Sequence, residues 1–136
     1  MKNVKLFKML LLISIVLNVL IVTSGIVLMD TLPQVLKEYS SQKSEILITI
    51  ELILGITTLL LWTLSIIGLW KFKKWGRNLL ITSIVLTLIM YLIDGAVIMN
   101  AWENMFSELF MLVEGILVSM SFSDEINEEI ESRLKK

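Results

Sequence analysis

Two apolar stretches joined by a short basic loop decide the fold: ILITIELILGITTLLLWTLSIIGLWKFKKWGRNLLITSIVLTLIMYLIDGAVIM, residues 46–99. A helix needs about 20 apolar residues to cross the roughly 30 Å of hydrocarbon in a bilayer. The runs 46–70 and 79–99 both reach that length. Because little more than the loop KFKKWGR, residues 71–77, separates them, we expect an antiparallel hairpin of two membrane-spanning helices.

Two further apolar runs lie on either side of this hairpin. The last run is the weaker, because Glu108 and Glu114 both lie inside it. The predicted spans are about 9–29, 46–70, 79–99 and 105–122. The alternative is that the last run stays out of the bilayer, which would leave the C-terminus on the opposite side.

Composition agrees with lipid as the surrounding solvent. Of the 136 residues, 56% are hydrophobic and 18% charged, and the mean hydropathy is +0.83. A soluble domain has about 45–50% apolar and about 25% charged residues. The net charge of −1 predicts no nucleic-acid partner. With no Cys or His, and no motif for a nucleophile, a phosphate-binding loop or a metal, we expect neither an enzyme nor a cofactor.

The basic residues predict the orientation of the spans. All but two of the 12 basic residues fall on one side of the predicted membrane. They are Lys2, Lys5, Lys8, Lys71, Lys73, Lys74, Arg77, Arg133, Lys135 and Lys136. The positive-inside rule assigns that side, and with it both termini, to the cytoplasm. The first run also resembles a signal peptide, but its apolar part exceeds the usual length of about 7–15 residues, so we predict a retained helix.

The inner loop is interpreted as a topology and lipid anchor. Its members are Trp70, Lys71, Lys73, Lys74, Trp75 and Arg77. Aromatic side chains gather at headgroup level, and a basic cluster attracts anionic lipid. A dedicated lipid-binding function is the alternative.

Two segments outside the spans can form short helices. Residues 33–39 form either an interfacial helix with proline in its first turn or a plain solvated loop. In the tail 123–136, Ile126, Ile130 and Leu134 recur at helical spacing and make one apolar stripe. The stripe can lie on the membrane, pack beneath the helices or bind a partner, and a frayed amphipathic tail is the simplest expectation.

Three carboxylates lie near the outer ends of their spans: Glu51, Asp94 and Glu108. From the helical rise, all three sit roughly 4–8 Å below the outer surface. They would form an outer-leaflet acidic cluster if they faced one another. The favoured interpretation is that the three carboxylates have no special role, because side chains near helix ends can reach the headgroup water.

Glu114 lies deeper, roughly 13 Å from the outer end of its span and close to the midplane. Four polar side chains lie at a similar depth and are its candidate partners: Asn18, Thr57, Thr58 and Thr87. Glu114 is either the proton- or cation-exchanging carboxylate of a small transporter, or a neutral polar tie between helices worth about 0.6–2 kcal/mol.

The tie is the favoured interpretation of Glu114. Transporter sites gather several polar groups beside broken helices, whereas only single glycines interrupt these spans. These glycines are equally suited to close packing between helices. They are Gly25, Gly55, Gly68, Gly95 and Gly115.

Two passages carry a resemblance: GLWKFKKWGRNLLI, residues 68–81, and SELFMLVEGILVSMSFS, residues 107–123. They resemble the inner loop and the last span of an uncharacterised family of small bacterial inner-membrane proteins with four transmembrane helices. The resemblance implies that architecture and a cytoplasmic-membrane location, and it carries over no functional residue. Small multidrug exporters have a similar size, but they carry an essential glutamate in the first span, where this chain has Asn18.

The sequence thus predicts an all-α integral membrane protein. It would form an antiparallel four-helix bundle at 1–122, with both termini in the cytoplasm and an amphipathic tail at 123–136. The expected role is non-enzymatic interaction within the membrane, with lipid, a second copy or a membrane protein partner. One alternative is a small cation-coupled transporter, or a transporter subunit, working as an oligomer. Another is an immunity protein against a membrane-active toxin, which no residue selects.

Overall fold

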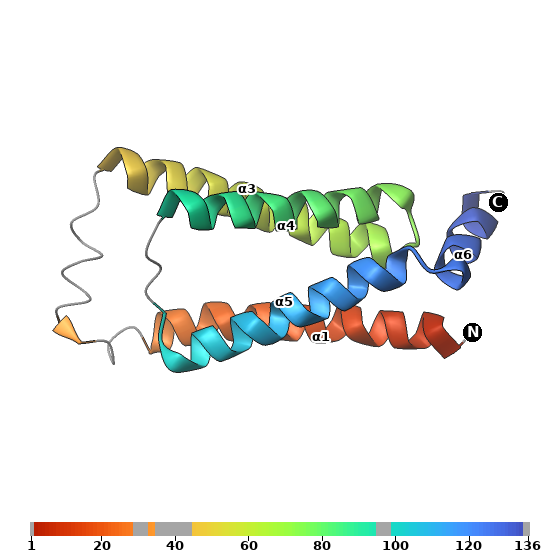
Figure 1. The fold of residues 1–136 in the computed structure, drawn as a ribbon, viewed down its shortest axis with the longest axis horizontal. Helices are drawn as coiled ribbons and strands as arrows, with labels where there is room; N and C mark the ends of the chain where they lie inside the picture. Colours follow the sequence, from red (N-terminus) through yellow and green to blue (C-terminus); the bar gives the residue numbers. More distant parts are fainter. Residues whose placement is uncertain (1, 29–32, 35–44, 95–98, 135–136) are drawn as a thin grey trace.

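The computed structural model describes residues 2–28, 33–34, 45–94 and 99–134. In these ranges every regular element is a helix (Figure 1). The main helices are α1 (Lys2–Val27), α3 (Glu45–Trp70), α4 (Lys74–Asp94), α5 (Ala101–Ser121) and α6 (Asp124–Leu134). The segment 33–39 falls largely outside the described ranges, as does Gly95.

Four of these helices, α1, α3, α4 and α5, are long and apolar enough to cross a membrane. The prediction of four spans is confirmed in that sense, and the chain has the composition of a multi-pass membrane protein. Many large apolar side chains on these helices are exposed. This is the outer surface that helices facing lipid tails require.

The last of the four long helices begins earlier than the sequence predicts. α5 begins at Ala101 rather than near residue 105, because Asn100 caps it: Oδ1 accepts a hydrogen bond from the backbone N–H of Glu103 (2.8 Å). Residues 100–104, between the two predicted spans, are therefore the cap and first turn of α5. α4 is described as far as Asp94, and residues 95–98 of the predicted span lie outside the described part of the chain.

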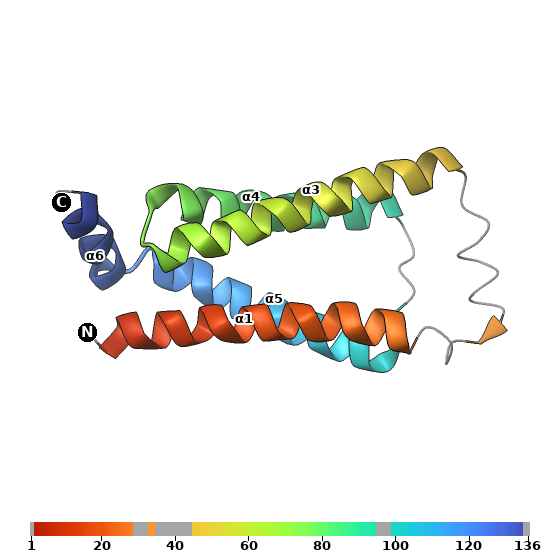
Figure 2. The ribbon, with the colours of Figure 1, turned by 180° about the vertical axis from the view of Figure 1, so that it is seen from behind.

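The same asparagine joins α5 to α1. Its Nδ2 donates to the carbonyl oxygen of Ser24 (3.0 Å) and to Oε2 of Glu103 (3.2 Å). Gly25 leaves room for the side chain of Glu103 against α1, since a Cβ on Gly25 would lie 3.1 Å from Oε1 of Glu103. α1 and α5 form one packed antiparallel pair, although they are far apart in the sequence (Figure 2).

α3 and α4 form the second pair, and they meet at two glycines. A Cβ on Gly68 would lie 2.6 Å from Cα of Gly76, and a Cβ on Gly76 would lie 2.5 Å from the nitrogen of Leu69. Phe72 reverses the chain between the helices with a φ of 53°, and its buried ring lies 6.0 Å from that of Phe7. Small residues at such crossings let two helix backbones approach closely.

Close packing does not explain every span glycine. A Cβ on Gly115 would meet nothing within 4 Å, and one on Gly55 would lie an ordinary 3.9 Å from Cε of Met90. The expectation of close helix contacts therefore holds for Gly68 and fails for Gly115.

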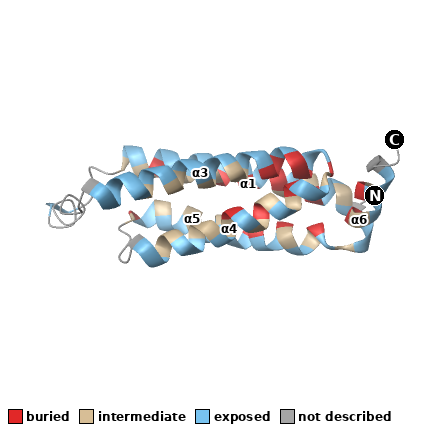
Figure 3. Ribbon diagram, turned by 90° about the horizontal axis from the view of Figure 1, so that it is seen from above, coloured by how far each residue is buried: buried red, intermediate tan, exposed pale blue. Residues whose placement is uncertain are grey.

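The two pairs are joined mainly at one end, called the closed end below. Helices pack along their length within each pair, whereas contacts between the pairs are sparse. Both termini and α6 lie at the closed end (Figure 1), and buried residues gather toward it (Figure 3). The core consists of Phe7, Leu11, Leu17, Ile66, Leu69, Phe72, Leu80, Val113, Leu117, Ile126 and Ile130.

α6 packs across the closed end. Ile126 and Ile130 of the predicted apolar stripe are each 1% exposed, and α6 contacts α1 and α5. Arg77 of α4 helps to hold it, because Nη1 donates to the carbonyl oxygen of Ser121 (3.3 Å) and to Oδ1 of Asn127 (3.1 Å). The expectation of a frayed tail is wrong, since Ile126 and Ile130 are buried inside the protein; the side chain of Leu134 lies outside the described residues.

Candidate functional site

Glu114 lies on the face of α5 that meets the other helices, and its side chain is buried. Its Oε1 accepts a hydrogen bond from Oγ of Ser14 on α1 (2.6 Å) and another from Nε1 of Trp62 on α3 (3.0 Å). One oxygen atom thus joins three helices and links the two pairs. This is a polar tie, made with partners other than those that the sequence predicted.

The second carboxylate oxygen of Glu114 lacks such contacts. Oε2 is buried, and it has no hydrogen-bond partner among the residues that the structure describes. Leaving a buried polar atom without a partner costs about 1–3 kcal/mol. Native proteins seldom carry such an atom without a reason, such as a bound water, an ion or a ligand. Oε2 is therefore the part of Glu114 that a structural tie does not explain.

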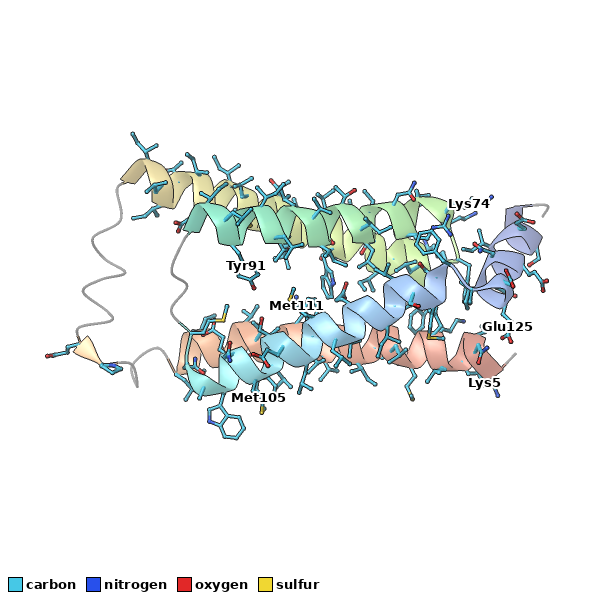
Figure 4. The ribbon with its side chains drawn as sticks, viewed as in Figure 1. Lys5, Lys74, Tyr91, Met105, Met111 and Glu125 are labelled. Carbon is cyan, nitrogen blue, oxygen red and sulfur yellow. The ribbon has the colours of Figure 1, made fainter. Side chains whose placement is uncertain are left out.

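Glu114 lines a cavity of about 300 Å³ between the pairs, and all four long helices contribute to its walls. Most of the lining is apolar or aromatic: Ile21, Leu59, Trp62, Ile84, Met90, Tyr91, Met99, Phe110 and Met111. The ring of Trp62 lies 5.8 Å from that of Phe110 on the opposite pair. Figure 4 shows Tyr91 of α4 directed toward the α1–α5 pair.

Besides Trp62 and Tyr91, which carry a polar atom on an aromatic ring, six side chains of the lining are polar. They are Asn18, Thr58, Ser83, Thr87, Ser107 and Glu114. The hydroxyls of Ser83 and Thr87 donate to carbonyl oxygens within α4. Of the described residues that line this cavity, Glu114 alone has an acidic or basic side chain.

The cavity continues toward the end of the helices opposite the closed end, called the open end. A second hollow of about 590 Å³ shares part of its lining with the cavity. The shared residues are Tyr91, Met99, Ser107 and Met111, and the hollow adds Asn100, Ala101, Asn104 and Glu108. At the closed end, the space between the pairs is filled by the buried side chains of Phe7, Leu11, Leu69 and Leu117. In the part of the chain that the structure describes, Glu114 thus lies at the deep end of a route that opens away from the termini.

The predicted partners of Glu114 lie in two environments. Asn18, Thr58 and Thr87 line the cavity with it, but the hydrogen bonds to its carboxylate come from other residues. Thr57 is exposed, and its hydroxyl donates to the carbonyl oxygen one turn earlier in α3 (2.7 Å). Thr57 is therefore outside the site.

Sequence reasoning missed Ser14 and Trp62. Ser14 precedes Asn18 by four positions, and Trp62 follows Thr58 by four. Residues at i and i+4 share a helix face, so a search by helix face as well as by depth would have found both.

The three shallow carboxylates do not form a described cluster. Glu108 borders the hollow at the open end and accepts a hydrogen bond from Nδ2 of Asn104 (3.5 Å). Glu51 is half-buried on α3, and the side chain of Asp94 lies outside the described part of the chain. Among the described residues, no three acidic side chains are placed to hold a metal ion.

The basic loop lies at the closed end. Trp70 and Trp75 are 39% and 45% exposed, as residues at a headgroup boundary can be. Nζ of Lys74 lies 3.9 Å from Oε1 of Glu131 on α6. Arg77 differs from the exposed anchors, because its guanidinium lies 4.2 Å from the centroid of the Phe122 ring and binds α6 as well.

Comparison with protein-family models, curated proteins and solved structures found no match for this chain. The four long apolar helices define its class as multi-pass and membrane-spanning by length and composition. Glu114 and the cavity that it lines define the candidate site.

Proposed function

We propose that this chain forms an antiparallel four-helix bundle in the bacterial cytoplasmic membrane, with both termini in the cytoplasm. An even number of spans returns the chain to the side where it began. Both termini lie at the closed end, together with the basic loop 71–77 (Figures 1 and 2). Positive charge marks the cytoplasmic side. The hollow at the open end would then face the outside.

We further propose that the protein is not an enzyme and acts by binding a small ligand between its helix pairs at Glu114. One observation carries this proposal: a buried carboxylate oxygen that has no hydrogen-bond partner among the described residues lies at the deep end of a cavity. Ligand sites are concave and mostly apolar, with few placed polar groups. This cavity has each of these properties.

A tie alone would not need a carboxylate here. Oε1 supplies the one acceptor that Ser14 and Trp62 use. Oε2 adds the cost of desolvation without strengthening the tie. A glutamine would accept the same two hydrogen bonds without a formal charge. A ligand that donates a hydrogen bond to Oε2 would offset the desolvation cost and would explain why the residue is a glutamate.

Cation-coupled transport is the second candidate, and the shape of the space between the pairs favours it. That space is hollow toward one end and packed at the other. An alternating-access carrier has this shape in one of its states. Proteoliposomes showing saturable, gradient-driven flux would separate a carrier from a binding protein. For interaction with a membrane partner, the exposed faces of the long helices are the candidate surface, because Ile126 and Ile130 of α6 are buried.

Single cysteines test the route, because the chain has no Cys of its own. Thr87→Cys places a thiol in the cavity, Thr57→Cys places a matched thiol on an exposed helix face, and Ser65→Cys lies in the packed closed end. A membrane-impermeant thiol reagent added from outside should modify only Thr87→Cys. The proposed route would be contradicted if the external reagent failed to modify Thr87→Cys, or if it modified Ser65→Cys.

Binding is tested with three aromatic probes of different charge: 2-phenylethylammonium, 2-phenylethanol and 3-phenylpropionate. The protein is held in lipid nanodiscs, and modification of Thr87→Cys is timed with and without each probe. At least one probe should slow the reaction in proportion to its occupancy of the site. If the route is open and none of the three probes slows modification, the proposed function is wrong.

A further inference from the structure

We infer that the ligand is a small lipophilic ammonium ion, an organic cation with at least one N–H group and an apolar body. The inference rests on the proposed function and adds the chemical class of the ligand. Its source is a combination found in the described part of the chain: a carboxylate oxygen without a hydrogen-bond partner, a lining that is otherwise uncharged, and an aromatic pair in the cavity wall.

The hydrogen-bonding requirement comes from Glu114. Ser14 and Trp62 both donate to Oε1, which fixes the side chain and leaves Oε2 as the acceptor still to be satisfied. An ammonium N–H meets this need best, because charge-assisted hydrogen bonds are about twice as strong as neutral ones. The carboxylate is already held in place, so little ordering remains to be done when a ligand arrives.

The charge requirement comes from the rest of the lining. Apart from Glu114, the described residues of the cavity carry no acidic or basic side chain. A buried carboxylate without a counter-charge is unfavourable, and an ammonium ion supplies that charge. Glu108 at the open end adds a negative charge on the way in. Negatively lined clefts raise the local concentration of cations and would repel an anionic ligand.

The apolar requirement comes from the aromatic and methionine side chains. Trp62 and Phe110 lie side by side in the cavity wall, and aromatic faces attract cations. Met90, Met99 and Met111 add flexible, polarisable walls that adapt to an apolar body. The volume of about 300 Å³ favours a small ligand.

Simpler ions fit the site less well. A hard metal cation takes about six or more oxygen ligands, whereas much of the lining that Glu114 shares consists of methionine, aliphatic and aromatic side chains. A proton on Oε2 would turn an acceptor without a partner into a donor without a partner. Neither ion uses the aromatic walls.

The test compares 2-phenylethylammonium with propylbenzene, its uncharged carbon isostere, by titration into protein in nanodiscs. Glu114→Gln is the matched variant, because it keeps the oxygen that Ser14 and Trp62 use and replaces Oε2 with a group that cannot accept. We expect the ammonium to bind wild type at least about tenfold more tightly than Glu114→Gln. Propylbenzene should bind both proteins alike.

Equal affinity of the ammonium for wild type and Glu114→Gln would overturn this inference. If the variant does not fold, wild type alone decides: phenethyltrimethylammonium, which has no N–H, should bind more weakly than the primary ammonium, and tighter or equal binding counts against the inference. The cysteine assay separates the two proposals. Protection by 2-phenylethanol or 3-phenylpropionate without protection by the ammonium leaves the proposed function standing and rejects the ammonium ligand.

Discussion

Replacing Gly76 by alanine tests how closely α3 and α4 approach each other. A Cβ at this position would lie 2.5 Å from the nitrogen of Leu69 and 2.6 Å from the carbonyl carbon of Gly68. Both are backbone atoms, which cannot turn aside as a side chain can, so the helices must move apart until these contacts exceed 3.0 Å. Overpacking of this kind costs about 1–3 kcal/mol. We expect Gly76→Ala to lose that amount of unfolding free energy.

The assay is reversible unfolding in mixed micelles, followed by circular dichroism as the fraction of sodium dodecyl sulfate rises. Gly115→Ala is the matched control, because the same methyl group would meet nothing within 4 Å there. Alanine also favours a helix over glycine by up to about 1 kcal/mol, so this control should match or exceed wild type. Equal unfolding free energies for Gly76→Ala and Gly115→Ala would refute the close approach of the two helices.

Three further substitutions test the tie, the cap and the tail. Glu114→Leu removes the acceptor that joins three helices and should lower the unfolding free energy by about 1–2 kcal/mol, whereas Glu114→Gln should lower it by less than half as much. Asn100→Ala removes the cap of α5 and should cost about 1 kcal/mol, seen as faster amide hydrogen exchange in the first turn of that helix. Ile126→Asp should detach α6 and speed proteolysis of the tail, while the exposed control Glu128→Ala leaves it unchanged. Wild-type behaviour of Glu114→Leu, Asn100→Ala or Ile126→Asp would contradict the contact that each removes.

The sequence predicts the four long helices well, because the thickness of the hydrocarbon sets their length. It does not predict where α5 begins. The predicted span starts only near residue 105, whereas the side chain of Asn100 accepts a hydrogen bond from the backbone N–H of Glu103 and caps a helix that begins at Ala101. A boundary that depends on one capping side chain is not visible in the average hydropathy of a window.

The facing of the helices is also hard to predict in a membrane. Thr57 and Thr58 are neighbours in the sequence, yet they are about 100° apart around a helix, and Thr58 alone reaches the cavity. In a soluble helix an apolar stripe marks the buried face. In these spans lipid and interior accept the same apolar residues. Depth alone therefore does not identify Ser14 and Trp62 as partners of Glu114, because it does not say which faces of α1 and α3 meet α5.

Arg77 links two properties of the protein: the expected orientation of the helices in the membrane and the stability of the C-terminal end of α5. α5 has no basic residue in its last turn, although the carbonyl end of a helix carries the negative half of its macrodipole. Arg77 supplies that charge from α4, because its Nη1 lies 3.3 Å from the carbonyl oxygen of Ser121, the last residue of α5. The loop charge expected to set the orientation of one helix pair therefore also compensates the dipole of a helix in the other pair. Neutralising Arg77 would alter both at once.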